Sequence, residues 1–287
     1  GYLPPYKTFC ARFEKPIVQD EDANAVRRLN QFTGPFILRR MKSEVLRELP
    51  PKTENLRRVE LETEQRKLYL AAVVDAREKL RAAKPEDKMT VFAVLMRLRE
   101  ICCDPRLVAD NWTGSSAKLE ACLELVTEAV AGGHRILLFS QFTSMLELLA
   151  KRLDEAGVSH FTLQGSTPKP VRAEQVRRFN QGEADVFLIS LRAGGTGLNL
   201  TAADIVIHYD PWWNLAAQNQ ATDRAYRIGQ RNPVQVYRLI AQDTIEEKIV
   251  ELQQAKQSLA DTVTGGADGA ILSMNPEQLL QLLGEEA

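Results

Sequence analysis

The sequence is short of cysteine and histidine, and it has no long apolar run. It has four cysteines, with no Cys-x-x-Cys pair and no histidine at zinc-ligand spacing: Cys10, Cys102, Cys103 and Cys122. This pattern argues against a metal site and against a disulfide framework. No run of about 18 apolar residues is present, and no basic stretch followed by an apolar one opens the sequence, which predicts neither a membrane span nor a secretory signal. We therefore expect a chain with no metal site of its own, in the cytoplasm beside the nucleoid if bacterial or in the nucleus if eukaryotic.

An excess of positive charge is also missing, because 37 Lys and Arg stand against 38 Asp and Glu. The charge of the whole chain therefore gives no argument for nucleic acid. Locally the balance differs: residues 35–58 hold seven basic and three acidic side chains, whereas the sequence from Asp261 onward holds five acidic and no basic ones. This segregation permits a basic face on a neutral protein, and an ordinary solvated surface explains it equally well.

From about residue 115 the sequence alternates between short apolar runs and amphipathic segments. Runs typical of buried strands lie at 135–140, 160–163, 185–190, 204–209 and 234–240. Helical periodicity is found between and around them at 115–131, 144–157, 170–181, 214–228 and 244–260. Parallel strands need crossovers of this length, so the pattern predicts an α/β fold with helices on both faces of a parallel sheet. In such folds, function collects beyond the carboxyl ends of the strands.

The first part of the chain has a different pattern. Residues 1–58 are rich in proline and charge, which predicts loops and short helices. Two helices are predicted at 62–83 and 89–102. Together they predict a helical hairpin that protrudes from, or leads into, the main domain.

A complete phosphate-binding loop is absent from the sequence. No Gly-x-x-x-x-Gly-Lys-Ser/Thr motif occurs, and no acidic pair ends a buried strand where it would hold magnesium. The loop RAGGTGLNLTAAD at 192–204 lies between two buried strands, and its glycines let backbone amides approach a phosphate or a ribose. It departs from the dinucleotide fingerprint, because Leu200 stands where the third glycine belongs. A tight turn is the alternative interpretation, and a chain that hydrolyses a nucleotide unaided is not expected.

Two arginines stand out in the segment QATDRAYRIGQ at 220–230. Arg224 and Arg227 are three residues apart, so on the predicted helix both project from one face. Two guanidinium groups on one face can clamp the γ-phosphate of a nucleotide bound elsewhere and stabilise charge during phosphoryl transfer. Ordinary salt bridges on a surface helix are the alternative.

Four blocks of sequence together resemble one family. They are FILRRMKSEVLRELPPK (36–52), ILLFSQFTSMLELLAKRL (136–153), LISLRAGGTGLNLTAADIVIHYDPWWN (188–214) and QATDRAYRIGQ (220–230). From about residue 1 to 260, the sequence resembles the C-terminal RecA-like lobe of the Swi/Snf DNA translocases in helicase superfamily two. The resemblance implies the helicase C-terminal lobe of the P-loop NTPase class, a RecA-like parallel sheet with a helical protrusion and a C-terminal brace helix. It assigns the tail of the first lobe, the linker and a protrusion segment to 1–58, the helical protrusion to 59–112, the lobe to 113–243, and the brace helix with a C-terminal extension to 244–287.

The resemblance also implies a role for individual residues. Arg224 and Arg227 look like the family's paired arginines, which reach across a cleft to the triphosphate held by the other lobe. Gly195, Gly197 and Asn199 look like the motif that approaches the nucleotide, with the asparagine near the ribose. Contacts with DNA are implied for Ser140, Gln141, Gly165, Ser166, Arg192 and Trp213, and at flanking positions for Lys118 and Arg172.

Partners and cofactors are implied in the same way. ATP and Mg²⁺ would be held mainly by a first RecA-like lobe of the same parent chain, so this chain by itself is expected to be inactive. Double-stranded DNA is the expected partner, and a protein–DNA complex is a possible target. We expect no membrane partner and a monomeric oligomeric state. Two other functions stay open: a non-catalytic DNA- or protein-binding module, and a lobe of an RNA helicase.

Overall fold

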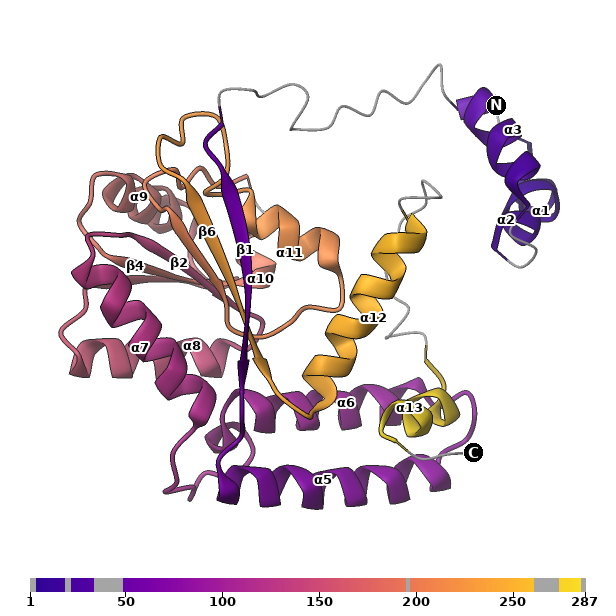
Figure 1. Cartoon of the computed structure of the whole chain (residues 1–287), viewed down its shortest axis with the longest axis horizontal. Coiled ribbons are helices and arrows are strands. Elements are labelled where there is room, and N and C mark those ends of the chain that lie inside the picture. The colour runs from indigo at the N-terminus through magenta and orange to yellow at the C-terminus, as the bar shows by residue number, and fades with distance from the viewer. Residues whose placement is uncertain (1–3, 19–21, 34–48, 195–196, 261–273, 285–287) are drawn as a thin grey trace. The chain divides into compact units, whose positions relative to one another are not determined.

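The computed structural model describes residues 4–18, 22–33, 49–194, 197–260 and 274–284 (Figure 1). Its contacts divide the chain into two units, residues 1–48 with 261–265, and residues 49–260 with 266–287. In the smaller unit, short helices pack around Phe13, Ile17 and Ala25. These helices are α1 Tyr6–Phe9, the π-helix η1 Cys10–Glu14, α2 Lys15–Val18 and α3 Ala23–Thr33.

The larger unit is built on a six-stranded sheet with the strand order β1-β6-β5-β2-β4-β3. Every pair of neighbouring strands is parallel. This topology confirms the predicted α/β fold with a parallel sheet. The strands are β1 Lys52–Val59, β2 Ile136–Ser140, β3 His160–Leu163, β4 Val186–Ser190, β5 Ile205–His208 and β6 Val234–Ala241.

Helices cover both faces of the sheet. Because side chains alternate between the two faces along each strand, one strand contributes to a core on each side. In β2, Ile136 and Leu138 join a core that includes residues of α7 and α8, whereas Leu137 and Phe139 join a second core with residues of α9 and α11. The central strands are therefore buried on both sides and read as continuous apolar runs in the sequence. The covering helices are α7 Ala117–Ala131, α8 Thr143–Glu155, α9 Lys169–Asn180, α10 Leu191–Gly194, and α11 Leu215–Thr222.

Strand β1 was not predicted, because residues 52–58 were read as part of a stretch of loops and short helices. The backbone of Lys52–Val59 pairs along its whole length with β6, from Lys52 opposite Val234 to Val59 opposite Ala241. Most of its side chains are exposed, so the strand lacks the apolar alternation by which strands are recognised. Ion pairs accompany the backbone pairing instead, with Glu54 contacting both Lys52 and Arg238.

The predicted helical hairpin is present as α5 Thr63–Ala82 and α6 Lys88–Cys103 (Figure 1). It shares a third core with α12 Ile245–Ala260 and α13 Pro276–Leu282, and fully buried leucines such as Leu95 and Leu279 contribute to it. A short 3-10 helix, Pro105–Leu107, follows the hairpin. The hairpin is thus packed against the helix that follows β6.

Candidate functional site

The glycine loop and the arginine segment lie side by side beyond the sheet, although they are more than 20 residues apart in sequence. The amide of Leu200 donates to the carbonyl of Arg224 at 3.0 Å. The side chain of Gln230 donates to the carbonyl of Ala203 at 2.7 Å. These two hydrogen bonds join the ends of the two segments, so the loop and the arginines form one surface.

Arg224 and Arg227 do not share a helical face, which corrects the sequence prediction. Helix α11 ends at Thr222, and both arginines lie in the turns that follow. The carbonyl of Arg224 is bonded to Leu200 of the glycine loop. The chain therefore leaves the helix to pair with the loop, and the two arginines project from successive turns.

The two arginines also differ in exposure. Arg224 is 6% exposed, and Arg227 is exposed. Burial, followed by the positive charge of Arg227, lowers the pKa of Arg224, and Asp223 acts in the opposite direction. The charge of Arg227 thus disfavours the charge on Arg224, and a bound anion would oppose this effect.

The glycine loop itself is open. Gly197 has a φ of +46°, and no atom lies within 4 Å of the position that a Cβ would take. Its left-handed backbone, rather than crowding, is what favours glycine here. Asn199 is exposed, and its backbone carbonyl accepts a hydrogen bond from Asn180 at 2.8 Å. Gly195 lies outside the described residues, and Arg192 lies in α10 with a side chain outside the described part.

Lys118 does not face solvent, and the predicted DNA contact is therefore corrected. Its side chain on α7 is fully buried and forms an ion pair with Glu246 on α12, which is buried as well. Glu246 also accepts a hydrogen bond from the amide of Ala241 at 2.8 Å. An ammonium group removed from water needs such a partner, so Lys118 fixes α12 to the lobe and does not reach a DNA phosphate.

Ser140 requires a similar correction, whereas its neighbour does not. The hydroxyl of Ser140 is buried and donates to Asp210 at 2.6 Å. The amide of Gln141 also donates to Asp210, at 3.2 Å, and its side chain is partly exposed. Ser140 thus binds the carboxylate at the end of β5 inside the protein, and Gln141 remains a predicted DNA contact.

The other predicted DNA contacts lie where strands end. Gly165 and Ser166 form an exposed turn directly after β3, and Arg172 lies partly buried in α9. Trp213 follows β5 and is partly buried against the core of the hairpin, while Trp212 packs against the core that includes residues of α9 and α11. The carboxyl ends of parallel strands meet at one edge of a sheet. These residues therefore lie on the same edge as Gln141.

One residue near this edge was missed by the sequence reading. Arg99 of α6 is fully buried and pairs with Asp210 at 3.1 Å. A guanidinium group between the buried Leu98 and Ile101 of an apolar helix is a signal that could have drawn attention to it.

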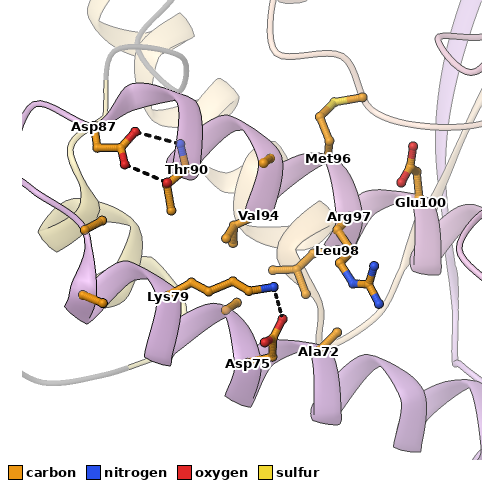
Figure 2. A pocket seen from close by; sticks show the side chains of 14 residues that line it. Ala72, Asp75, Lys79, Asp87, Thr90, Val94, Met96, Arg97, Leu98 and Glu100 are labelled. Carbon is orange, nitrogen blue, oxygen red and sulfur yellow. Dashed lines mark hydrogen bonds and ion pairs between the residues drawn. The ribbon is translucent and has the colours of Figure 1, made fainter.

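A groove of about 630 Å³ lies elsewhere, between α5 and α6 (Figure 2). Three of its charged side chains are used within the hairpin: Lys79 pairs with Asp75 at 2.7 Å, and Asp87 accepts hydrogen bonds from Thr90 that cap α6. No group of three or more His, Cys, Asp or Glu among the described residues could hold a metal ion. Within the described ranges, none of the helices combines the length and apolar content that a membrane span requires. The predicted nucleotide and DNA surface therefore remains the candidate site.

Two family models match successive parts of the chain. The SNF2-related domain matches residues 2–107, and the helicase conserved C-terminal domain matches residues 117–229. The chain belongs to the Swi/Snf family. Residues 192–204 and 224–227 both fall within the second match, so the surface described above belongs to the helicase C-terminal domain of this Swi/Snf chain.

Curated relatives and solved structures agree with this assignment. An uncharacterized ATP-dependent helicase of Mycoplasma pneumoniae is 38% identical over 98% of the chain and 27% of its own length. A putative ATP-dependent helicase/translocase of Bacillus subtilis is 38% identical over 98% of the chain and 32% of its own length. The Sulfolobus solfataricus SWI2/SNF2 ATPase core in complex with dsDNA is 30% identical, with a TM-score of 0.70 over 100% of this chain and 62% of that one. This Swi/Snf chain thus spans about a third or less of these two curated relatives.

Proposed function

We propose that this chain is the second lobe of an ATP-dependent motor that moves along double-stranded DNA. The observation that carries the proposal is the hydrogen bond between Leu200 and the carbonyl of Arg224, which joins the glycine loop to the arginine turns. It supports a shared surface for the phosphates and the ribose of one nucleotide. In this proposal Arg224 and Arg227 complete a site whose phosphate loop and Mg²⁺ ligands belong to a first lobe.

The residues at this surface fit a triphosphate. Arg227 is exposed, and it makes no ion pair with any residue that the structure describes. Gly197, in the glycine loop, offers a backbone without a Cβ and with no neighbouring atom within 4 Å of that position. ATP, when bound, supplies the phosphoanhydride bond whose hydrolysis drives the motor. The two guanidinium groups would hold the terminal phosphate and stabilise the charge that develops on it, and Asn199 would approach the ribose.

The DNA surface in this proposal is the edge where β2 to β5 end. Gln141, Gly165, Ser166, Arg172, Arg192 and Trp213 would contact the duplex there. Hydroxyls, backbone amides and guanidinium groups bind phosphates without reading the base sequence, as a motor that steps along any sequence requires. The Sulfolobus solfataricus core is described as a complex with dsDNA, which supports duplex DNA as the partner. Opening and closing of the two lobes over each ATP cycle would then advance the grip on DNA.

The role of Arg227 can be tested by ATP hydrolysis in the full-length protein that contains this chain. Replacing Arg227 with alanine removes one of the two charges from the phosphate surface, and we expect DNA-stimulated turnover to fall by about 10³-fold or more. Arg231→Ala is the matched control, because Arg231 is an exposed arginine four positions further along the chain. Its turnover should stay within about twofold of the wild type.

An unchanged turnover in Arg227→Ala would remove the phosphate-binding role. Equal losses in Arg227→Ala and Arg231→Ala would point to a general effect of surface charge rather than to this site.

A further inference from the structure

Arg99 occupies an unusual position in the helical hairpin. It lies on α6 between Leu98 and Ile101, and all three side chains are fully buried. A leucine at this position would pack without any cost of burying a charge, and a buried ion pair is by itself a weak source of stability. The contacts that Arg99 makes therefore need another explanation.

The guanidinium group of Arg99 contacts three residues of the loop that follows β5. Its Nη2 donates to Asp210 at 3.1 Å and also to the carbonyl of Pro211. Its central carbon lies 4.0 Å from the centroid of the Trp213 ring, which is cation–π distance. A planar guanidinium can form an in-plane ion pair and a stack on its face at the same time, which an ammonium group cannot do.

The same loop is held from other elements as well. The side chain of Gln253 on α12 donates to the carbonyl of Trp212, and Gln218 on α11 accepts from the Trp212 amide at 3.4 Å. Asp210 also accepts from Ser140 and from the amide of Gln141. The loop 210–214 is thus fixed at the sheet edge, and Arg99 is the contribution of the hairpin.

We propose that Arg99 is a positioning residue, which fixes the Trp213 ring and the end of β5 so that Trp213 and Gln141 meet duplex DNA in one orientation. The inference rests on the proposed function, since it concerns the same DNA surface. It assigns the hairpin a part in DNA binding although Arg99 is buried and touches no DNA. Nε and Nη1 of Arg99 have no hydrogen-bond partner among the described residues, so its geometry depends on the two contacts of Nη2 and on the stack.

The first test measures the position of Trp213 without ATP or DNA. The chain has three tryptophans, so Trp112→Phe with Trp212→Phe leaves Trp213 as the single reporter. Adding Arg99→Lys keeps a charge for Asp210 but removes the planar stack, and we expect quenching of Trp213 by acrylamide to rise about twofold. Arg97→Lys is the matched control, because Arg97 is exposed on the same helix. Its quenching should equal that of the parent chain, and circular dichroism with thermal unfolding checks that each variant folds.

The second test measures how duplex DNA stimulates ATP hydrolysis by the full-length protein. For Arg99→Lys, we expect the duplex concentration that gives half-maximal ATPase stimulation to rise about fivefold, while turnover at saturating DNA changes less than twofold. Trp213→Leu should produce a similar rise, and the double variant should add little to it, because both changes disrupt the same contact. If Arg99→Lys does not fold, Arg99→Gln, which keeps a planar group without the charge, takes its place in both tests.

The outcomes separate the two proposals. If duplex DNA does not stimulate the wild type, the proposed function fails, while the quenching result still decides whether Arg99 positions Trp213. The role of Arg99 would be overturned if Arg99→Lys and Arg97→Lys gave the same acrylamide quenching of Trp213 and the same duplex concentration for half-maximal ATPase stimulation. Fully additive effects of Arg99→Lys and Trp213→Leu would overturn it as well.

Discussion

At the scale of single residues, two pairs of opposite charges lie fully buried in the larger unit. Lys118 pairs with Glu246, and Arg99 pairs with Asp210. The partners are 128 and 111 positions apart in the sequence. Sequence patterns around each residue show a charge and suggest a surface, because nothing local reveals a distant partner. The prediction of a DNA contact for Lys118 was wrong for this reason.

The glycines and arginines of the candidate site could be identified from the sequence, but their geometry could not. The glycine loop and the two arginines were identified from type and spacing, and the structure places them together. Their exposure could not be predicted, since the segment leaves the helix after Thr222 and the backbone of Arg224 bonds to Leu200, far away in the sequence. Arg224 is nearly buried there, and Arg227 is exposed.

His208 should make the stability of the chain depend on pH. It is buried in β5, with Nε2 at 2.9 Å from the Thr222 hydroxyl, and burial followed by the charges of Arg238 and Lys52 lowers its pKa to about 3. The unfolded chain binds a proton near the ordinary pKa of 6.5, whereas the folded chain does so only near 3. The contribution of His208 is thus complete above about pH 6.5 and is lost as the pH falls toward 3. Between about pH 7.5 and pH 5 we expect a loss of roughly 2 kcal/mol.

The measurement is the free energy of unfolding in urea at both pH values, for the wild type and for His208→Gln. Burial raises the pKa of Asp210 and of Glu246, so other groups also titrate differently on folding. Subtracting the variant from the wild type removes their contribution. The same pH dependence in both proteins would show that His208 is protonated equally in the folded and unfolded chains.

At the scale of elements, apolar strands and amphipathic helices were predictable, and polar elements were not. The five strands predicted from apolar runs are all present, because burial on both faces leaves a continuous signal. Strand β1 escaped prediction since its stability comes from backbone pairing with β6 and from ion pairs such as Arg57 with Glu124. Helix α11 was predicted to run to 228 because its composition permits it, yet it ends at Thr222. Hydrogen bonds to segments far away in the sequence accompany both differences, from β6 to β1 and from Leu200 to the turn after α11.

The hairpin of α5 and α6 should contribute to the stability of the larger unit through its buried face. Leu95 is fully buried in the core that α5 and α6 share with α12 and α13. Leu95→Ala leaves a cavity there, and we expect it to reduce the free energy of unfolding by about 2–5 kcal/mol. Met89→Ala on the same helix is the control, because Met89 is 76% exposed. It should change stability by about 0.5 kcal/mol or less.

Urea unfolding followed by circular dichroism measures both variants. Equal, small effects would mean that the hairpin unfolds separately from the lobe, in which case its core would not add to the measured transition.

At the scale of the whole molecule, an all-parallel sheet brings the ends of β2, β3, β4 and β5 to one edge. Residues that follow these strands are far apart in sequence, yet the fold gathers them, so the fold class that was predicted also indicates where the candidate site should lie. The net charge of −1 gives this molecule no general attraction for DNA. Any binding to duplex must therefore come from a small number of local phosphate contacts.

The salt dependence of duplex binding counts these contacts. Arg172 and Arg192 are the two charged residues among the proposed contacts, and each phosphate neutralised contributes a slope of about −0.9 to log K against log salt. We expect a slope near −2 for this chain and near −1 for Arg172→Ala, with the same values on duplexes of different sequence. Arg177→Ala is the control on the same helix, because Arg177 is exposed but already paired with Glu174. Anisotropy titrations of a labelled duplex at about 50–200 mM salt measure the slopes. Tight binding that ignores salt and selects one sequence would favour a non-catalytic DNA-binding module over a motor lobe.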